Sequence, residues 1–154
     1  MSLCSAANVK ERAGITSSAD DTLIGTIITN TSSSIAGYCN RILELNASNA
    51  TEYYSGYGHS FLQLKRFPVV SITSIKIDTA YLFTGSSLVA DTDYRIHSDT
   101  GIVYRIGSSL GNSLSSNYNC SWIEGFDNIQ VVYKGGYVAS GGTPGTGETA
   151  LPAD

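Results

Sequence analysis

The chain contains 154 residues, of which 42% are hydrophobic and 14% are charged, and its formal net charge is −4. This length suits a single domain, and the apolar content is too high for an intrinsically disordered protein. No apolar run reaches the ~18–20 residues of a membrane-spanning helix, and the acidic balance counts against a protein that binds duplex DNA. The N-terminus has no basic region before its short apolar patch. We therefore expect no signal peptide, and a protein that stays in the cytosol or joins an assembly made there.

The first third of the sequence predicts two helices. Residues 9–15 form a short helical pattern that Gly14 ends, and residues 16–21 supply hydroxyl and carboxylate caps for the next helix. Apolar residues then recur at three- and four-residue steps, which predicts a long amphipathic helix over residues 19–45. The asparagines at 46 and 49 are expected to end this helix.

The middle of the long helix, residues 29–34, consists of poor helix formers. We therefore expect tertiary packing to hold it in place. The prediction is that its apolar stripe packs against a sheet formed by residues 51–137; the stripe consists of Ile24, Ile27, Ile28, Ile35 and Ile42.

The remainder of the chain predicts strands. Residues 51–57 and 60–65 flank a Gly-Tyr-Gly-His sequence, which favours a hairpin. Residues 69–78 predict a strand whose apolar phase switches between Ile72 and Ile75, so a bulge is expected there.

A second hairpin is predicted from residues 93–97 and 102–106, with a Gly-containing turn at 98–101. Residues 107–121 predict a loop, and residues 129–134 predict the last long strand, which the glycines after it would stop. Helices followed by strands indicate an α+β fold with a mainly antiparallel sheet.

The C-terminal segment differs in composition from the rest of the chain. Residues 140–150 are rich in glycine, which predicts a flexible tail. We therefore expect one domain over residues 1–139 and a flexible tail over residues 140–154.

The sequence shows no pattern typical of catalysis or of a metal site. His59 and His97 have no metal-ligand spacing, and the three cysteines are far apart, so no metal, no cofactor and no enzymatic activity are predicted. Asp91, Asp93 and Asp99 lack the spacing of a calcium loop and are interpreted as turn residues. Ser, Thr and Tyr are abundant, which fits either a surface for protein contacts or simply a β-rich domain.

The order of the segments resembles the head–tail connector (adaptor, or head-completion) family of tailed double-stranded DNA bacteriophages. The resemblance rests on VKERAGI near the N-terminus, on the helix with Tyr38 and Arg41, and on the strand sequence FPVVSITSIKID. It continues through DYRIHSDTGIVYRI, WIEGFDNIQVVYKGGY and the final LPAD, so it covers roughly residues 7–154.

The resemblance implies a structural virion protein that forms a ring, usually of twelve subunits, beneath the portal. Such a ring extends the DNA channel, completes the head, and presents a platform for stopper or tail-completion proteins. It would be assembled in the host cytoplasm, without a membrane and without sequence-specific DNA binding. The family's segment that matches Leu151, Pro152, Ala153 and Asp154 leads into a portal-binding helix or arm, so these residues are the predicted portal or neighbour-subunit contact. Either such an arm lies beyond this sequence, or residues 140–154 bind the portal in its place.

Two other classes remain open at this point. A protein- or glycan-binding β module of a phage fibre or baseplate would explain the Tyr and hydroxyl content, but it fits a long N-terminal helix poorly. A small hydrolase is the weakest alternative, because no nucleophile–base pair can be named.

Overall fold

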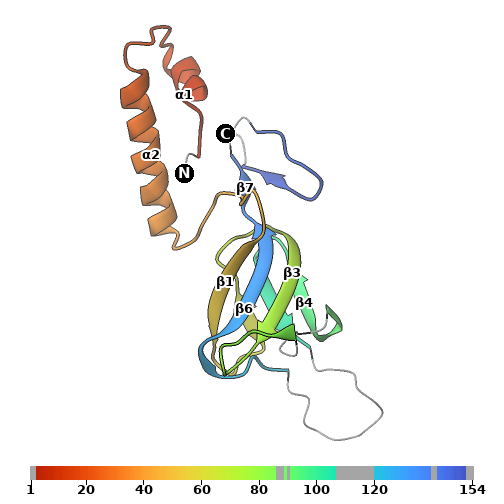
Figure 1. The fold of residues 1–154 in the computed structure, drawn as a ribbon. Helices are drawn as coiled ribbons and strands as arrows, with labels where there is room; N and C mark the ends of the chain where they lie inside the picture. Colours follow the sequence, from red (N-terminus) through yellow and green to blue (C-terminus); the bar gives the residue numbers. More distant parts are fainter. Residues whose placement is uncertain (1–2, 86–88, 90, 107–119, 140–141, 152–154) are drawn as a thin grey trace, which may run out of the picture.

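The computed structural model describes residues 3–85, 89, 91–106, 120–139 and 142–151. Two helices come first, followed by strands, which confirms the predicted α+β class (Figure 1). The helices are α1 (Ala6–Ala13) and α2 (Asp21–Tyr38). The strands are β1 (Ala50–Gly56), β2 (Phe61–Gln63), β3 (Val69–Ile77), β4 (Tyr94–His97), β5 (Ile102–Arg105), β6 (Gly125–Gly135), β7 (Tyr137–Val138) and β8 (Thr149–Ala150), and a 3-10 turn, η2 (Asp91–Asp93), precedes β4.

Both helices end in the same way, with a residue in the left-handed conformation. Gly14 ends α1 as predicted, with a φ of 66°. The prediction that the second helix reaches residue 45 is wrong, because Asn40 adopts a φ of 48° and stops it. The amide of Asn40 bonds to the Gly37 carbonyl at 3.2 Å and that of Arg41 to the Ala36 carbonyl at 3.3 Å. This is the Schellman pattern, and it leaves residues 39–49 as a linker.

The apolar stripe of α2 does not pack on the sheets as predicted. Ile24 and Ile28 are buried, but Ile27 is 54% exposed and Ile35 is 41% exposed, and Ile42 lies in the linker. The described core cluster contains no residue of either helix, and Figure 1 shows the helix pair set apart from the sheets. Within α2, the hydroxyls of Thr26, Thr29 and Ser34 each donate to the carbonyl four residues earlier.

The strands form two three-stranded antiparallel sheets, in the orders β1-β6-β3 and β2-β5-β4, and a short parallel pair, β7-β8. The predicted hairpin of β1 with β2 is wrong, because β1 pairs with β6 and β2 pairs with β5. The chain crosses between the sheets at Gly56, where an added Cβ would lie 1.8 Å from the Ile123 carbonyl oxygen. Backbone hydrogen bonds from the Gly58 amide to the Trp122 carbonyl and from the Trp122 amide to the His59 carbonyl then hold the segment between β1 and β2.

Other strand predictions are confirmed. β4 and β5 form the second hairpin, and the register of β3 on β6 shifts between Ile72 and Ser74, at the expected bulge. β6 ends at Gly135, as predicted, and begins earlier than expected, at Gly125. Of the predicted loop, residues 107–119 lie outside the described residues.

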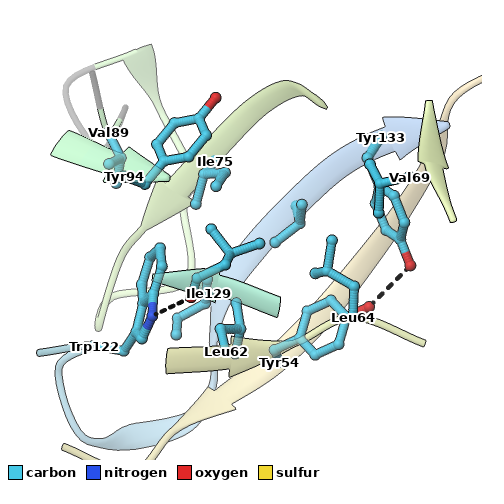
Figure 2. Close-up of a cluster of buried hydrophobic side chains, with 12 residues drawn as sticks. Tyr54, Leu62, Leu64, Val69, Ile75, Val89, Tyr94, Trp122, Ile129 and Tyr133 are labelled. Atoms are coloured by element: carbon cyan, nitrogen blue, oxygen red, sulfur yellow. Dashed lines mark hydrogen bonds between the residues drawn. The ribbon is translucent and has the colours of Figure 1, made fainter. Parts of the chain in front are cut away.

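The hydrophobic core lies between the two three-stranded sheets (Figure 2). Trp122 is almost fully buried in it and donates its indole N–H to the Val103 carbonyl at 3.3 Å. The buried members of this core are Tyr54, Leu62, Leu64, Val69, Ile75, Val89, Tyr94, Val103, Trp122, Ile129, Val131 and Tyr133. The molecule therefore consists of a sheet core and a helix pair joined to it by the linker.

Candidate functional site

The C-terminal site predicted from the sequence is described only in part. Pro152, Ala153 and Asp154 lie outside the described residues. Leu151 is half-buried, and its amide donates to the Val138 carbonyl at 3.2 Å. The predicted contact of these four residues with a portal or neighbour therefore stays a prediction.

The described part of the tail folds back on the end of the sheet core. β8 pairs with β7, and the Lys134 ammonium contacts the Glu148 carboxylate at 2.7 Å. Hydrogen bonds from Lys134 and from the Gly145 amide lower the pKa of Glu148. Both residues of β8 are exposed, so this docking buries little apolar surface. The predicted division between domain and tail at residue 139 stays a prediction.

The most prominent feature of the helix pair is an exposed apolar stripe on α2. It consists of Leu23, Ile27, Ile35 and Tyr38, which are 59%, 54%, 41% and 94% exposed. At 3.6 residues per turn these side chains lie within a sector of about 120°. Residues 22–38 carry no charged side chain, whereas exposed helix faces normally do. Asn30, Thr31 and Ser34 lie between Ile27 and Ile35 in or beside the same sector, so the face is uncharged and carries its large apolar side chains toward its two ends. Exposed apolar side chains on an uncharged face are typical of a surface that another protein covers.

A second exposed surface, the aromatic face, lies on the outer side of sheet β2-β5-β4. Phe61 on β2 pairs with Tyr104 on β5, and they are 51% and 40% exposed. His59 stacks on Phe61 with ring centroids 5.5 Å apart, and His97 meets Tyr104 edge-on at 5.7 Å. Arg95, opposite Tyr104 on β4, completes the face. This places the two histidines in ring contacts.

A groove of about 410 Å³ borders the aromatic face, beside β1 and β2. Tyr53, Tyr57 and Phe61 line it as partly exposed aromatic side chains, and Lys65 and Asp127 add one charge of each sign. Both neighbouring strands are edges of their sheets. The groove thus extends the aromatic face toward the edge of β1.

The linker is fixed to the sheet core by Arg41, the residue of the predicted Tyr38–Arg41 motif. Its guanidinium lies 3.4 Å from the centroid of the Phe67 ring and also donates to the Phe67 carbonyl. Backbone bonds between Leu43, Leu45 and Tyr137 continue the attachment along β7. Tyr38 itself points to solvent, so the structure separates the two residues of the motif.

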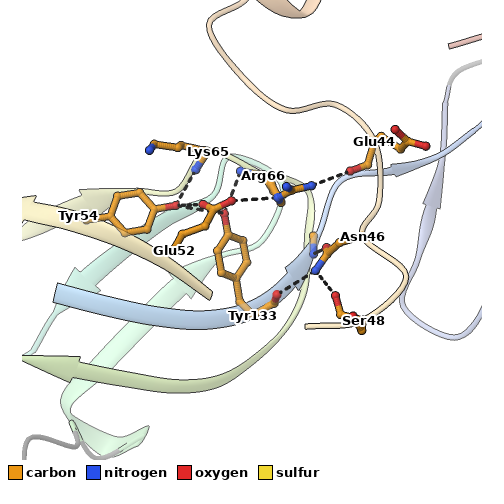
Figure 3. Close-up of polar contacts among 9 residues, drawn as sticks. Glu44, Asn46, Ser48, Glu52, Tyr54, Lys65, Arg66 and Tyr133 are labelled. Carbon is orange, nitrogen blue, oxygen red and sulfur yellow. Dashed lines mark hydrogen bonds and ion pairs between the residues drawn. The ribbon is translucent and has the colours of Figure 1, made fainter. Parts of the chain in front are cut away.

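A buried polar cluster stabilises the sheet core next to this attachment (Figure 3). The Glu52 carboxylate accepts hydrogen bonds from the hydroxyls of Tyr54 and Tyr133 and from Nε of Arg66, which lies 2.9 Å away. Burial raises the pKa of Glu52, but these hydrogen bonds and the Arg66 charge outweigh burial, so the pKa lies below its ordinary value. Burial and the Glu52 contact raise the pKa values of both tyrosines.

The polar cluster is structural in character, because its groups bind one another and the backbone. The Tyr54 hydroxyl accepts from the Lys65 amide at 3.0 Å and the Tyr133 hydroxyl from the Arg66 amide at 3.1 Å. An Arg66 guanidinium N–H donates to the Glu44 carbonyl at 3.4 Å, which links the cluster to the linker. The cluster therefore contacts both the sheet core and the linker.

Within the described ranges, no three His, Cys, Asp or Glu side chains come together to hold a metal ion. Asp91 accepts from the Tyr94 hydroxyl and Asp93 faces Arg105. No disulfide joins any of Cys4, Cys39 and Cys120. In the part of the chain that the structure covers, no helix is both long and apolar enough for a membrane span.

Sequence reasoning missed both exposed surfaces. The uncharged run over residues 22–38 is the signal that could have marked α2 as a contact surface. The aromatic face had no such signal, because its rings come from positions near 60 and near 100 that only the pairing of β2 with β5 brings together.

Comparison with protein families shows that residues 5–65 match the model of the phage gp6-like head-tail connector protein family. The matched region comprises α1, α2, the linker, β1 and β2. A comparison with curated proteins finds no match. The resemblance predicted from the sequence is therefore supported over residues 5–65, and over the rest of the chain it stays a prediction.

Proposed function

Because the chain shares its N-terminal region with the phage gp6-like head-tail connector proteins, we propose that it is a structural protein of the phage virion that joins head to tail. The match over residues 5–65 is the observation that carries this proposal. The match covers the helix pair and the linker that joins the pair to the sheet core. Within the pair, α2 carries the exposed stripe of large apolar side chains.

In its finer form, the proposal is a ring of twelve copies docked beneath the portal protein. The ring extends the DNA channel, completes the head after packaging, and presents a platform for a stopper or tail-completion protein. The net charge of −4 is compatible with DNA that slides through the channel, because a wall without a strong cationic patch does not hold phosphates. The ring would be assembled in the host cytoplasm and would act without enzymatic chemistry.

Contact with the portal is assigned to the tail in this proposal, through Leu151, Pro152, Ala153 and Asp154. What supports this assignment is the shallow docking of β8 on β7, since a segment with both residues exposed can be transferred to a partner at small cost.

Disruption of the gene in its phage tests the proposed function. The expected result is DNA-filled or leaking heads and separate tails, with infectivity restored by the wild-type gene. Normal joined virions would contradict the proposal. Joined particles that lack only fibres would instead favour the fibre or baseplate alternative.

A further inference from the structure

We propose that the exposed stripe of α2, which consists of Leu23, Ile27, Ile35 and Tyr38, docks in one copy on the aromatic face of sheet β2-β5-β4 in a second copy. This inference rests on the proposed ring and specifies which two surfaces build it. It commits each surface to another copy of the same chain rather than to a portal or a tail protein.

The stripe has no cover within the described part of its own chain. α1 has 8 residues and α2 has 18, so at 1.5 Å per residue α1 spans about 12 Å of a helix about 27 Å long. The buried apolar side chains Ile24 and Ile28 lie in the N-terminal half of α2, and Ser32 is buried beyond them, where its hydroxyl accepts from the Leu3 amide at 3.0 Å. Tyr38, in the last turn, is 94% exposed, so the C-terminal end of the stripe is the part with the least cover.

The aromatic face is suited to receive an uncharged helix. Its rings already contact one another, His59 with Phe61 and His97 with Tyr104. Docking therefore restricts the rotation of few further side chains and costs little conformational entropy. Exposed aromatic side chains provide large contact areas and are enriched at the centres of protein interfaces.

The charges of the two surfaces are complementary. α2 begins with Asp20 and Asp21 and contains no Lys or Arg. Asp21 pairs with Lys10 of the same chain at 2.6 Å, which leaves Asp20 as the acidic group for which the described residues show no ion pair. The strands β2, β4 and β5 contain no Asp or Glu, and Arg95 projects on the aromatic face. Two stripes packed in parallel would bring the Asp20 carboxylates together, whereas a stripe against the aromatic face can place Asp20 near a cation.

The geometry of the pairing makes it repeat. The stripe and the aromatic face lie on different parts of the molecule, the helix pair and the sheet core (Figure 1). When the stripe of one copy covers the aromatic face of the next copy, an open row of copies has a free stripe at one end and a free aromatic face at the other. Such head-to-tail contacts close into a ring when the rotation between copies permits it.

Two single substitutions and their mixture test this inference. Ile27→Asp places a carboxylate in the stripe, and Phe61→Asp places one in the aromatic face; each should weaken self-assembly roughly a hundredfold, because an unpaired charge is buried at the contact. Mixed in equal amounts, the two variants should form a one-to-one dimer and nothing larger. In that dimer the intact stripe of Phe61→Asp docks on the intact face of Ile27→Asp. Native mass spectrometry measures both results.

Matched controls separate a lost contact from a lost fold. Ser33→Asp lies on another side of α2, and Ser71→Asp lies at an exposed position of β3; both should assemble like the wild type. Fluorescence of the buried Trp122 reports whether each variant keeps its sheet core. If Phe61→Asp fails to fold, Tyr104→Asp replaces it on the same face.

The outcomes distinguish this inference from the proposed function. If the wild type forms rings and both interface variants still do so, the surfaces are assigned wrongly while the connector role stands. If only Ile27→Asp loses assembly and the mixture gives no dimer, the contact is stripe against stripe and the inference is overturned. If the wild type forms no ring in solution or on portal-bearing heads, the proposed ring fails and the inference fails with it.

Discussion

The Tyr133 hydroxyl donates a 2.8 Å hydrogen bond to the Glu52 carboxylate, although the two residues are 81 positions apart in the sequence. Their strands, β6 and β1, are neighbours in one antiparallel sheet. The same carboxylate accepts from Arg66, which follows β2 and in turn contacts the linker at Glu44. The Glu52 carboxylate therefore joins β1, β6 and the segment after β2, and Arg66 extends this network to the linker.

Glu52 should make stability depend on pH. Its pKa is lowered in the folded protein, so the stabilisation is fully present above the unfolded-state pKa and is lost as pH falls through the folded-state value. At pH 7, Glu52→Gln should lower the free energy of unfolding by about 1–3 kcal/mol, because the charged acceptor of the cluster is lost. Below about pH 4 the difference from the wild type should shrink.

Thermal denaturation at a series of pH values measures this difference. Glu11→Gln, at an exposed position of α1, serves as the control and should track the wild type. A difference between Glu52→Gln and the wild type that stays constant from pH 7 to pH 3 would exclude the charge of Glu52 as its cause.

Ile28→Asp should unfold the helix pair while the sheet core stays folded. Ile28 is buried in the helix pair, and no helix residue belongs to the described core of the sheets. A carboxylate at this site costs several kcal/mol when it is unpaired and buried. Helical circular dichroism should therefore decrease, while the unfolding transition seen by Trp122 fluorescence stays in place. A matching loss of the Trp122 transition would show that the two units fold as one.

Arg41→Ala should loosen the linker. The guanidinium stacks on Phe67 and donates to its carbonyl, so its removal frees the start of the linker from the sheet core. Limited proteolysis should then cut within residues 39–49 at least several times faster than in the wild type. Arg41→Lys should also be cut faster, because an ammonium does not stack as a planar guanidinium does. Equal cleavage rates for all three proteins would contradict the proposed attachment.

Deletion of residues 140–154 should leave the domain folded and abolish its attachment to portal-bearing heads. β8 is exposed, and a solvent-screened surface ion pair such as Lys134–Glu148 adds little stability, so the melting temperature should change little. A shorter deletion, of residues 152–154 alone, asks whether the last residues make the contact. If the protein without residues 140–154 still seals packaged heads, the portal contact lies elsewhere.

The features that could be predicted from the sequence depend on neighbouring residues. Gly14 ends α1, the turn at 98–101 joins β4 to β5, and the phase switch after Ile72 marks a real bulge. Each of these follows from the conformational preferences of a few consecutive residues, which sequence patterns report directly.

The features that could not be predicted depend on long-range packing. Ile42 and Leu43 continue the helical spacing, yet they follow Asn40 and belong to the linker, where Leu43 is buried and bonded to Tyr137. Likewise, the glycines at 56 and 58 are typical of a hairpin, but here they let the chain cross closely past Ile123 between two sheets. The aromatic face depends on the same pairing of distant strands.

Electron cryomicroscopy of the head–tail junction in mature virions tests the central claim most directly. The account predicts a closed ring between portal and tail into which the helix pair and the sheet core of this chain fit, with the DNA channel passing through its centre. A junction with no density that fits this fold, or the chain located in fibres or a baseplate, would contradict the connector role.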